Sequence, residues 1–260
     1  MATTWEQLAP RRDALARLGP IDLKLWSERL RLDHERADRH QSAELRAITG
    51  EVLGRARSAG AAAIVLSGST ARGRRTLVSD LDYHVIGVPS LKVADLPADI
   101  DLYADDVDRF WTKLRDGDDF AHWSVWYGCV LFDSGVMREA ARYVVEHDAW
   151  PDPERKLRQA SGALDFAEQM TGSGDYVATL EQVRGTLSLV ARWLLLSHDV
   201  FPLARDELAG QVEQLGFAGL AHALRRTIRE RPDDAELRWA VTQARTISQK
   251  GNLSNGHIAA

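Results

Sequence analysis

Hydrophobic and polar positions divide the chain into two parts that change character near residue 150. Residues 23–59 carry apolar side chains at helical spacing in a background rich in Arg, Glu and Ala. This pattern predicts amphipathic helix that is broken or capped near Gly50 and ended by Gly60. Short apolar or alternating runs predict strands at 61–66, 81–88, 99–104 and 129–132. Helical patterns at 105–114 and 119–127 lie between the third and the fourth predicted strand.

The segment Trp-Pro-Asp-Pro at 150–153 marks the change in pattern. Beyond it, almost every stretch has helical periodicity, at 154–169, 176–197, 206–215, 218–229 and 235–248. The chain is therefore predicted to be α+β, with a small mixed sheet and flanking helices over residues 1–150. That domain includes a helical N-terminal extension over about 1–59. An all-α helical bundle is expected over 151–250, followed by a tail at 251–260.

Composition narrows the function classes. The 260 residues include 38 acidic and 33 basic side chains, a net charge of −5, which disfavours a nucleic acid partner. A single cysteine, Cys129, excludes an intrachain disulfide framework and a cysteine-rich zinc site. The sequence shows neither a long apolar stretch nor a signal-peptide pattern, so no membrane partner is expected and the cytoplasm is the expected location.

Acidic residues in the predicted sheet are the candidate metal-binding residues. Asp80 and Asp82 lie two positions apart at the start of a predicted strand, so their carboxylates share one face. Because like charges repel, a cation is expected between them, and oxygen ligands suit a hard divalent ion such as Mg²⁺. Asp101, between Ile100 and Leu102, would bring a third carboxylate from a neighbouring strand. Asp99 shares that face and is the alternative third carboxylate.

A glycine-containing turn precedes the acidic pair. Gly68 and Ser69 directly follow the first predicted strand, and Gly68 lets the backbone approach a ligand closely. Ser69 offers a hydroxyl and an amide N–H at the start of a short helix, where phosphate binds favourably. Arg72, Arg74 and Arg75 lie just beyond, and at least one of them would reach a triphosphate. Arg72 is the one expected to bind it. Phosphate-binding groups and metal-binding carboxylates are thus expected from one strand–turn–strand unit.

Other residues near these motifs have two interpretations. His84 shares a face with Asp82, yet a histidine further along a strand is more often packed in the core. Asp105 and its acidic neighbours would suit a cationic acceptor, and equally suit the first turn of a helix. Trp123, Trp126 and Tyr127 would stack on a base or sugar, although core packing is favoured for them.

The combination of motifs resembles the nucleotidyltransferases of the DNA polymerase β superfamily. The strings that carry the resemblance are Gly-Ser-Thr-Ala-Arg-Gly at 68–73, Ser-Asp-Leu-Asp at 79–82 and Ile-Asp-Leu at 100–102. The similarity is greatest to the bacterial branch of antibiotic and minimal nucleotidyltransferases. It implies that Gly68 and Ser69 hold phosphates, that Asp80 and Asp82 bind metal, and that Asp101 completes the triad or acts as general base.

The resemblance and the residues together lead to a functional expectation. The chain is expected to transfer a nucleoside monophosphate from an NTP, with ATP favoured, to a hydroxyl of a small-molecule acceptor, releasing pyrophosphate. One or two Mg²⁺ ions, or Mn²⁺, would serve as cofactor. An aminoglycoside-like antibiotic or a natural-product intermediate is the expected acceptor. The alternatives are nucleotidylation of a protein or tRNA in a toxin–antitoxin-type system, and a regulatory module that binds nucleotide without turnover.

Overall fold

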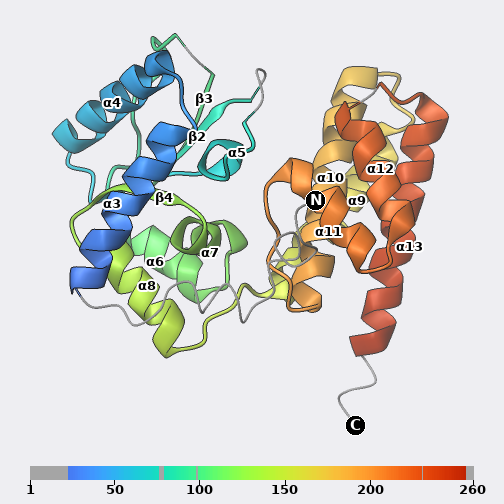
Figure 1. The fold of residues 1–260 in the computed structure, drawn as a ribbon. Coiled ribbons are helices and arrows are strands. Elements are labelled where there is room, and N and C mark those ends of the chain that lie inside the picture. Colours follow the sequence, from blue (N-terminus) through green and yellow to red (C-terminus); the bar gives the residue numbers. More distant parts are fainter. Residues whose placement is uncertain (1–22, 76–78, 98, 230, 256–260) are drawn as a thin grey trace. The chain divides into compact units, whose positions relative to one another are not determined.

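The chain forms two compact units that divide between Pro151 and Asp152. The computed structural model describes residues 23–75, 79–97, 99–229 and 231–255. The unit before the division contains a sheet with helices around it, and the unit after it is built from helices (Figure 1). This arrangement confirms the predicted α+β class with a small mixed sheet.

Four short strands form the sheet in the order β3-β2-β1-β4. The central strand β1 pairs antiparallel with β2 and with β4, whereas β2 and β3 run parallel. All four residues of β1 are buried, as its continuous apolar sequence predicts. The edge strand β3 alternates between half-buried and exposed residues until its last position. The strands are β1 Ala63–Leu66, β2 Leu81–Ile86, β3 Ile100–Asp105 and β4 Cys129–Asp133.

Helices cover both faces of this sheet (Figure 1). On one face, the hydroxyl of Thr49 in α4 (Ala43–Ser58) lies 2.7 Å from the hydroxyl of Tyr83 in β2. Burial raises the pKa of Tyr83 to about 12. On the opposite face, His84 packs against Phe110 of α6 (Val107–Arg115) and Phe120 of α7 (Asp119–Trp126). The alternation of side chains along β2 thus separates the two halves of the core.

The helix α3 (Leu23–Arg39) covers the outer edge of β4. The Asp33 carboxylate accepts the backbone N–H of Val130 at 3.0 Å. The Arg36 guanidinium donates to the carbonyls of Tyr127 and Gly128 and to Asp33. An uncovered edge strand exposes unpaired backbone groups. Asp33 satisfies one of them on β4, and Arg36 binds two carbonyls just before the strand. The helix α3 therefore closes one side of the sheet. Residues 1–22 of the predicted N-terminal extension lie outside the described residues.

The predicted helix break near Gly50 is wrong, because the chain breaks at His40–Ser42 instead. Ser42 is the N-cap of α4 and its hydroxyl accepts the N–H of Leu45. Gly50 lies inside α4. A glycine in a helix interior costs only about 1 kcal/mol, which the packing of α4 on the sheet offsets.

Two helix starts also differ from the sequence prediction. Asp105, predicted as the first residue of a helix, ends β3, and the Asp106 carboxylate caps α6 by accepting the N–H of Arg109. The helix α8 (Val136–Glu146) was not predicted. Its first turn is held by the Asp133 carboxylate, which accepts the backbone N–H groups of Gly135, Met137 and Arg138. Asp133 is both the last residue of β4 and an acceptor for the first turn of α8. Few residues therefore lie between the two elements to mark the boundary in the sequence.

Helices make up the second unit, and their buried faces form one apolar core. Trp193 is its largest fully buried side chain. The buried Gln211 side chain ties down the connection between α10 and α11 by bonding the carbonyl of Phe201 and the N–H of Leu203. The helices are α9 Pro153–Met170, α10 Tyr176–Ser197, α11 Arg205–Gln214, α12 Ala218–Arg229 and α13 Asp234–Asn255.

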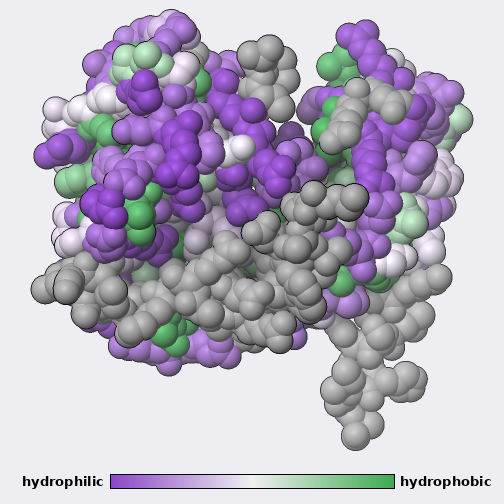
Figure 2. All heavy atoms as spheres, in the orientation of Figure 1, coloured by the Kyte–Doolittle hydropathy of each residue, from purple (hydrophilic) through white to green (hydrophobic). Residues whose placement is uncertain are grey.

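The last helix corrects the predicted tail. α13 continues to Asn255, so residues 251–255 are helical, and 256–260 lie outside the described residues. Helical hydrogen bonds propagate past the last core contact without needing further apolar residues. Within the part of the chain that the structure describes, no helix combines the length and apolar character needed to cross a bilayer. Hydrophilic residues predominate on the coloured surface in Figure 2.

The contact between α3 and β4 predicts a large effect of one substitution. Asp33→Ala leaves the N–H of Val130 and the Arg36 guanidinium without their buried carboxylate. We expect the free energy of unfolding to fall by about 2–4 kcal/mol in urea denaturation. Glu35→Ala is the matched control, since Glu35 is exposed and pairs only at the surface with Arg31; its effect should stay within about 0.5 kcal/mol. Equal stability of the two variants would contradict this role of Asp33.

Candidate metal and phosphate site

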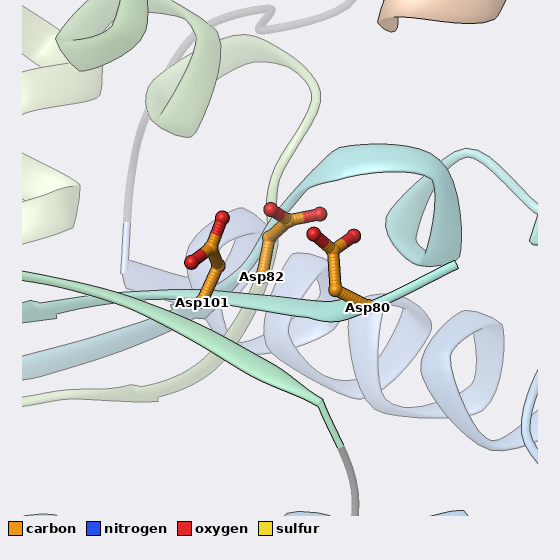
Figure 3. A group of neighbouring side chains, drawn as sticks. All are labelled: Asp80, Asp82 and Asp101. Carbon is orange, nitrogen blue, oxygen red and sulfur yellow. The ribbon is translucent and has the colours of Figure 1, made fainter. Parts of the chain in front are cut away.

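Three aspartate side chains meet at the start of β2 and β3 (Figure 3). One carboxylate oxygen from each of Asp80, Asp82 and Asp101 lies within 4.8 Å of the other two. Asp82 and Asp101 are direct partners in the parallel β2–β3 ladder, so their side chains leave the same face side by side. Asp80 comes just before β2, two residues from Asp82, and its carboxylate turns toward the other two.

The register of β3 decides between the two candidates for the third carboxylate. Asp101 joins Asp80 and Asp82, whereas Asp99 is not part of the group. Asp99 precedes the first residue of β3, and its backbone carbonyl accepts the N–H of Leu81. It is exposed. The residue types around Asp99 and Asp101 are similar, and only the pairing of Asp82 with Asp101 separates them.

Gly68 lies directly against the Asp82 carboxylate. The backbone of Gly68 has φ +62°, in the left-handed region that glycine adopts without strain. A Cβ atom at this position would lie 1.7 Å from Oδ2 of Asp82, so no other residue fits without displacing the carboxylate. The preceding residue, Ser67, donates its backbone N–H to the carbonyl of Asp82 at 2.8 Å. The turn after β1 is therefore bonded to the strand that carries the carboxylate.

The short helix α5 (Gly68–Ala71) contains the remaining part of the predicted phosphate turn. Ser69, next to Gly68, is half-buried, and its carbonyl accepts the N–H of Arg74. Arg72 follows the helix, and its guanidinium lies 5.4 Å from the centre of the Tyr127 ring. Arg75 donates to the carbonyl of Ser79, just before Asp80, at 2.7 Å. The Arg75 side chain thus links the end of the turn to the backbone just before the triad.

His84, two residues beyond Asp82 on the same face, is a core residue. It is fully buried, with Nδ1 2.9 Å from the hydroxyl of Ser124 and Nε2 3.1 Å from Oδ2 of Asp105. Burial lowers the pKa of His84, although Asp105 opposes this shift. The core-packing interpretation of His84 therefore holds.

Asp105 was missed as a structural centre by sequence reasoning. Lys113 Nζ lies 2.8 Å and 2.7 Å from its two carboxylate oxygens, and Arg109 Nε lies 3.1 Å from Oδ1. Burial by itself would raise the pKa of Asp105, but hydrogen bonds from His84 and Lys113 outweigh it and lower the pKa to about 2. Spacing in the sequence could have identified this role of Asp105. Asp105 shares the strand face of Asp101, and Lys113 follows it at a separation equal to about two helical turns.

The aromatic residues with two interpretations, and Cys129 beside them, pack in the interior. Trp123, Trp126, Tyr127 and Cys129 are all buried. Burial raises the pKa of the Cys129 thiol to about 11. The aromatic side chains of α7 therefore contribute mainly to the core of the sheet unit.

The donor set fits a divalent metal ion. Three carboxylates offer only oxygen ligands, which match the preference of Mg²⁺ and Mn²⁺. Asp82 is half-buried and Asp101 exposed, so further ligand positions would remain open to water or phosphate. A cation at this place would also offset the mutual repulsion of the three negative charges.

Comparisons with known proteins give a distant similarity among solved structures. No protein-family model matches the sequence, and no curated protein matches it. Among solved structures, the chain is similar to a nucleotidyltransferase-like protein from Exiguobacterium sibiricum 255-15, with 16% sequence identity and a TM-score of 0.40. The similarity covers 83% of this chain and 78% of that one.

The close approach of Gly68 to Asp82 generates a stability prediction. Gly68→Ala places a methyl group where the Asp82 carboxylate lies and puts alanine in a left-handed conformation. We expect a loss of about 1–3 kcal/mol in the free energy of unfolding, measured by chemical denaturation. Gly50→Ala is the control, because nothing lies within 4 Å of its added Cβ. That variant should gain up to about 1 kcal/mol. A Gly68→Ala protein as stable as the wild type would refute the predicted clash.

Proposed function

We propose that this chain is a metal-dependent nucleotidyltransferase of the DNA polymerase β superfamily, of the bacterial antibiotic or minimal branch. The observation that carries the proposal is the meeting of Asp80, Asp82 and Asp101 beside the backbone of Gly68. An exposed acidic cluster alone is common in proteins. Here it lies against a glycine-containing turn of the sequence that the family uses for phosphate, which makes a joint metal and phosphate site the favoured interpretation.

In this proposal Asp80, Asp82 and Asp101 hold one or two Mg²⁺ ions, with Mn²⁺ as a substitute. The bound metal would offset negative charge on the triphosphate and on the pyrophosphate that leaves. Each of the three carboxylates comes from, or directly adjoins, a strand of the same sheet. The sheet therefore fixes their positions relative to one another. Asp82 is held most tightly, since Gly68 and Ser67 contact its side chain and backbone respectively.

The phosphates would bind at the turn of Gly68 and Ser69. The absence of a Cβ at Gly68 gives a ligand access to the backbone, and Ser69 supplies a hydroxyl. Arg72 would have to move its guanidinium from the Tyr127 ring to reach a phosphate, or act from there at longer range. We assign Arg72 a charge-balancing role in nucleotide binding.

The reaction joins the acceptor hydroxyl oxygen to the α-phosphorus of the NTP. The bond between the α-phosphorus and the bridging oxygen breaks, and pyrophosphate leaves with that electron pair. The proton of the acceptor hydroxyl passes to a base, and Asp101 is suited to this because it is the exposed carboxylate on β3. ATP is the favoured donor. A small hydroxylated molecule, such as an aminoglycoside-like antibiotic or a natural-product intermediate, is the favoured acceptor.

An activity assay tests the proposal directly. Purified protein is incubated with Mg²⁺, labelled ATP or GTP and a panel of hydroxylated acceptors, and pyrophosphate release is measured. Asp80→Asn and Asp82→Asn should each reduce transfer at least about 10²-fold, because each removes a charged metal ligand. Asp99→Asn has the same change of charge two residues from Asp101 and should keep wild-type activity.

The same assay distinguishes the alternative functions. Label transferred to a copurifying protein or to tRNA would support nucleotidylation of a macromolecule instead of a small molecule. Nucleotide binding without pyrophosphate release on any acceptor would support a regulatory module. Near wild-type transfer by Asp80→Asn or Asp82→Asn would show that the metal site lies elsewhere.

A further inference from the structure

A buried polar network lies behind the three carboxylates, on the same face of the sheet. Its centre is Asp105, the last residue of β3, which bonds His84 of β2 and both Lys113 and Arg109 of α6. His84 in turn bonds Ser124 of α7. Two strands and two helices are thus joined through one carboxylate. Asp105 is four residues from Asp101, about 13 Å along the strand.

This network is not a second catalytic site, although Ser124, His84 and Asp105 stand in the order of a nucleophilic triad. His84 and Ser124 are both fully buried. The Ser124 hydroxyl also lies within hydrogen-bonding distance of the carbonyl of Phe120 in its own helix. A substrate has no access to such a hydroxyl. The network therefore acts on the position of the elements that it joins.

The strand β3 needs such an anchor because its apolar contacts are weak. It is an edge strand, and Ile100, Leu102 and Ala104 are only half-buried. Asp105 is the one buried residue of the strand. Apolar contacts this slight distinguish poorly between neighbouring registers. A two-residue slip would leave the buried His84 and the half-buried Lys113 without their carboxylate, and an unpaired buried polar group is costly.

The register that Asp105 selects is the one that creates the acidic group. Asp105 lies opposite Ile86, and in the same ladder Asp101 lies opposite Asp82. Repulsion among the three carboxylates opposes this register, because a slip that brings Tyr103 opposite Asp82 moves Asp101 away from Asp82. Two cationic side chains at the far end of the strand, Lys113 and Arg109, attract Asp105 and hold β3 in place.

We propose that Asp105 is a positioning residue that sets the register of β3 and thereby holds Asp101 in the metal site. The inference rests on the proposed function and deepens it. It makes the metal affinity of the three aspartates depend on an ion-pair network around the buried Asp105, which touches neither metal nor substrate. Loss of groups that orient metal ligands commonly weakens metal binding strongly.

Direct metal binding by the full chain tests this inference without an activity assay. Free Mn²⁺ is measured by electron paramagnetic resonance during titration of the protein with Mn²⁺ alone. Asp105→Asn should weaken Mn²⁺ binding by at least about 10-fold. Asp108→Asn, an exposed carboxylate of the same helix region with the same change of charge, should bind like the wild type. Circular dichroism establishes that each variant is folded.

A double variant separates positioning of Asp101 from general loss of stability. Once Asp101→Asn has removed the third ligand, adding Asp105→Asn should weaken Mn²⁺ binding no further, because the register of β3 then no longer matters for the site. A merely structural role would make the two losses multiply. Lys113→Gln, which removes one partner of Asp105 near the surface, should give a smaller loss and serves if Asp105→Asn does not fold.

The outcomes keep the two proposals apart. Mn²⁺ binding by the wild type together with unchanged binding by folded Asp105→Asn, or by Lys113→Gln in its place, overturns the positioning role and leaves the proposed function standing. Losses that multiply in the double variant also overturn it. Absence of Mn²⁺ binding by the wild-type chain overturns the proposed function, and the positioning role with it.

Discussion

Mutual repulsion of three carboxylates on one sheet face is the constraint on which the rest of the sheet unit depends. Oxygens of Asp80, Asp82 and Asp101 lie within 4.8 Å of one another. At that distance each pair costs about 1 kcal/mol in bulk water and about 3 kcal/mol at an effective dielectric constant of 20. Folding has to supply this energy until a cation offsets it, so the elements around the carboxylates must be held by contacts elsewhere.

The sheet unit holds them from three directions. The turn at Gly68 lies against Asp82 from the β1 side. Because Gly68 has no side chain, the Asp82 carboxylate occupies the space that a Cβ atom would fill. Farther away, α3 satisfies the edge of β4 through Asp33 and completes the sheet on that side. At the opposite edge, where β3 has few apolar contacts, Asp105 and its cationic partners provide the attraction. Repulsion at the acidic end of the sheet is thus offset by polar contacts at distant places.

Asp101 and Asp105 show how one residue type takes two different roles on one strand face. Asp101 is exposed and lies beside two other negative charges, a place that suits a ligand of a hard cation. Asp105 is buried among His84, Lys113 and Arg109, and its low pKa keeps it negative throughout the range in which proteins function. Neither composition nor net charge distinguishes them. Their difference comes from the helices that pack over one end of β3 and leave the other open.

Local patterns in the sequence determined most of the secondary structure and the residues of the candidate site. Strands 61–66 and 129–132, the helices of the second unit and the shared face of Asp80 and Asp82 follow from periodicity and turn residues, which act over a few positions. Whether these residues bind metal and phosphate stays a prediction. Tertiary structure alone decided that Asp101 and not Asp99 joins the pair, that the N-terminal helices break at Ser42 and cover an edge strand, and that Asp105 is a buried anchor. The physical reason is that strand register and burial depend on residues distant in sequence, and side chains such as Asp99, Asp101 and Asp105 differ only in what the rest of the fold places against them.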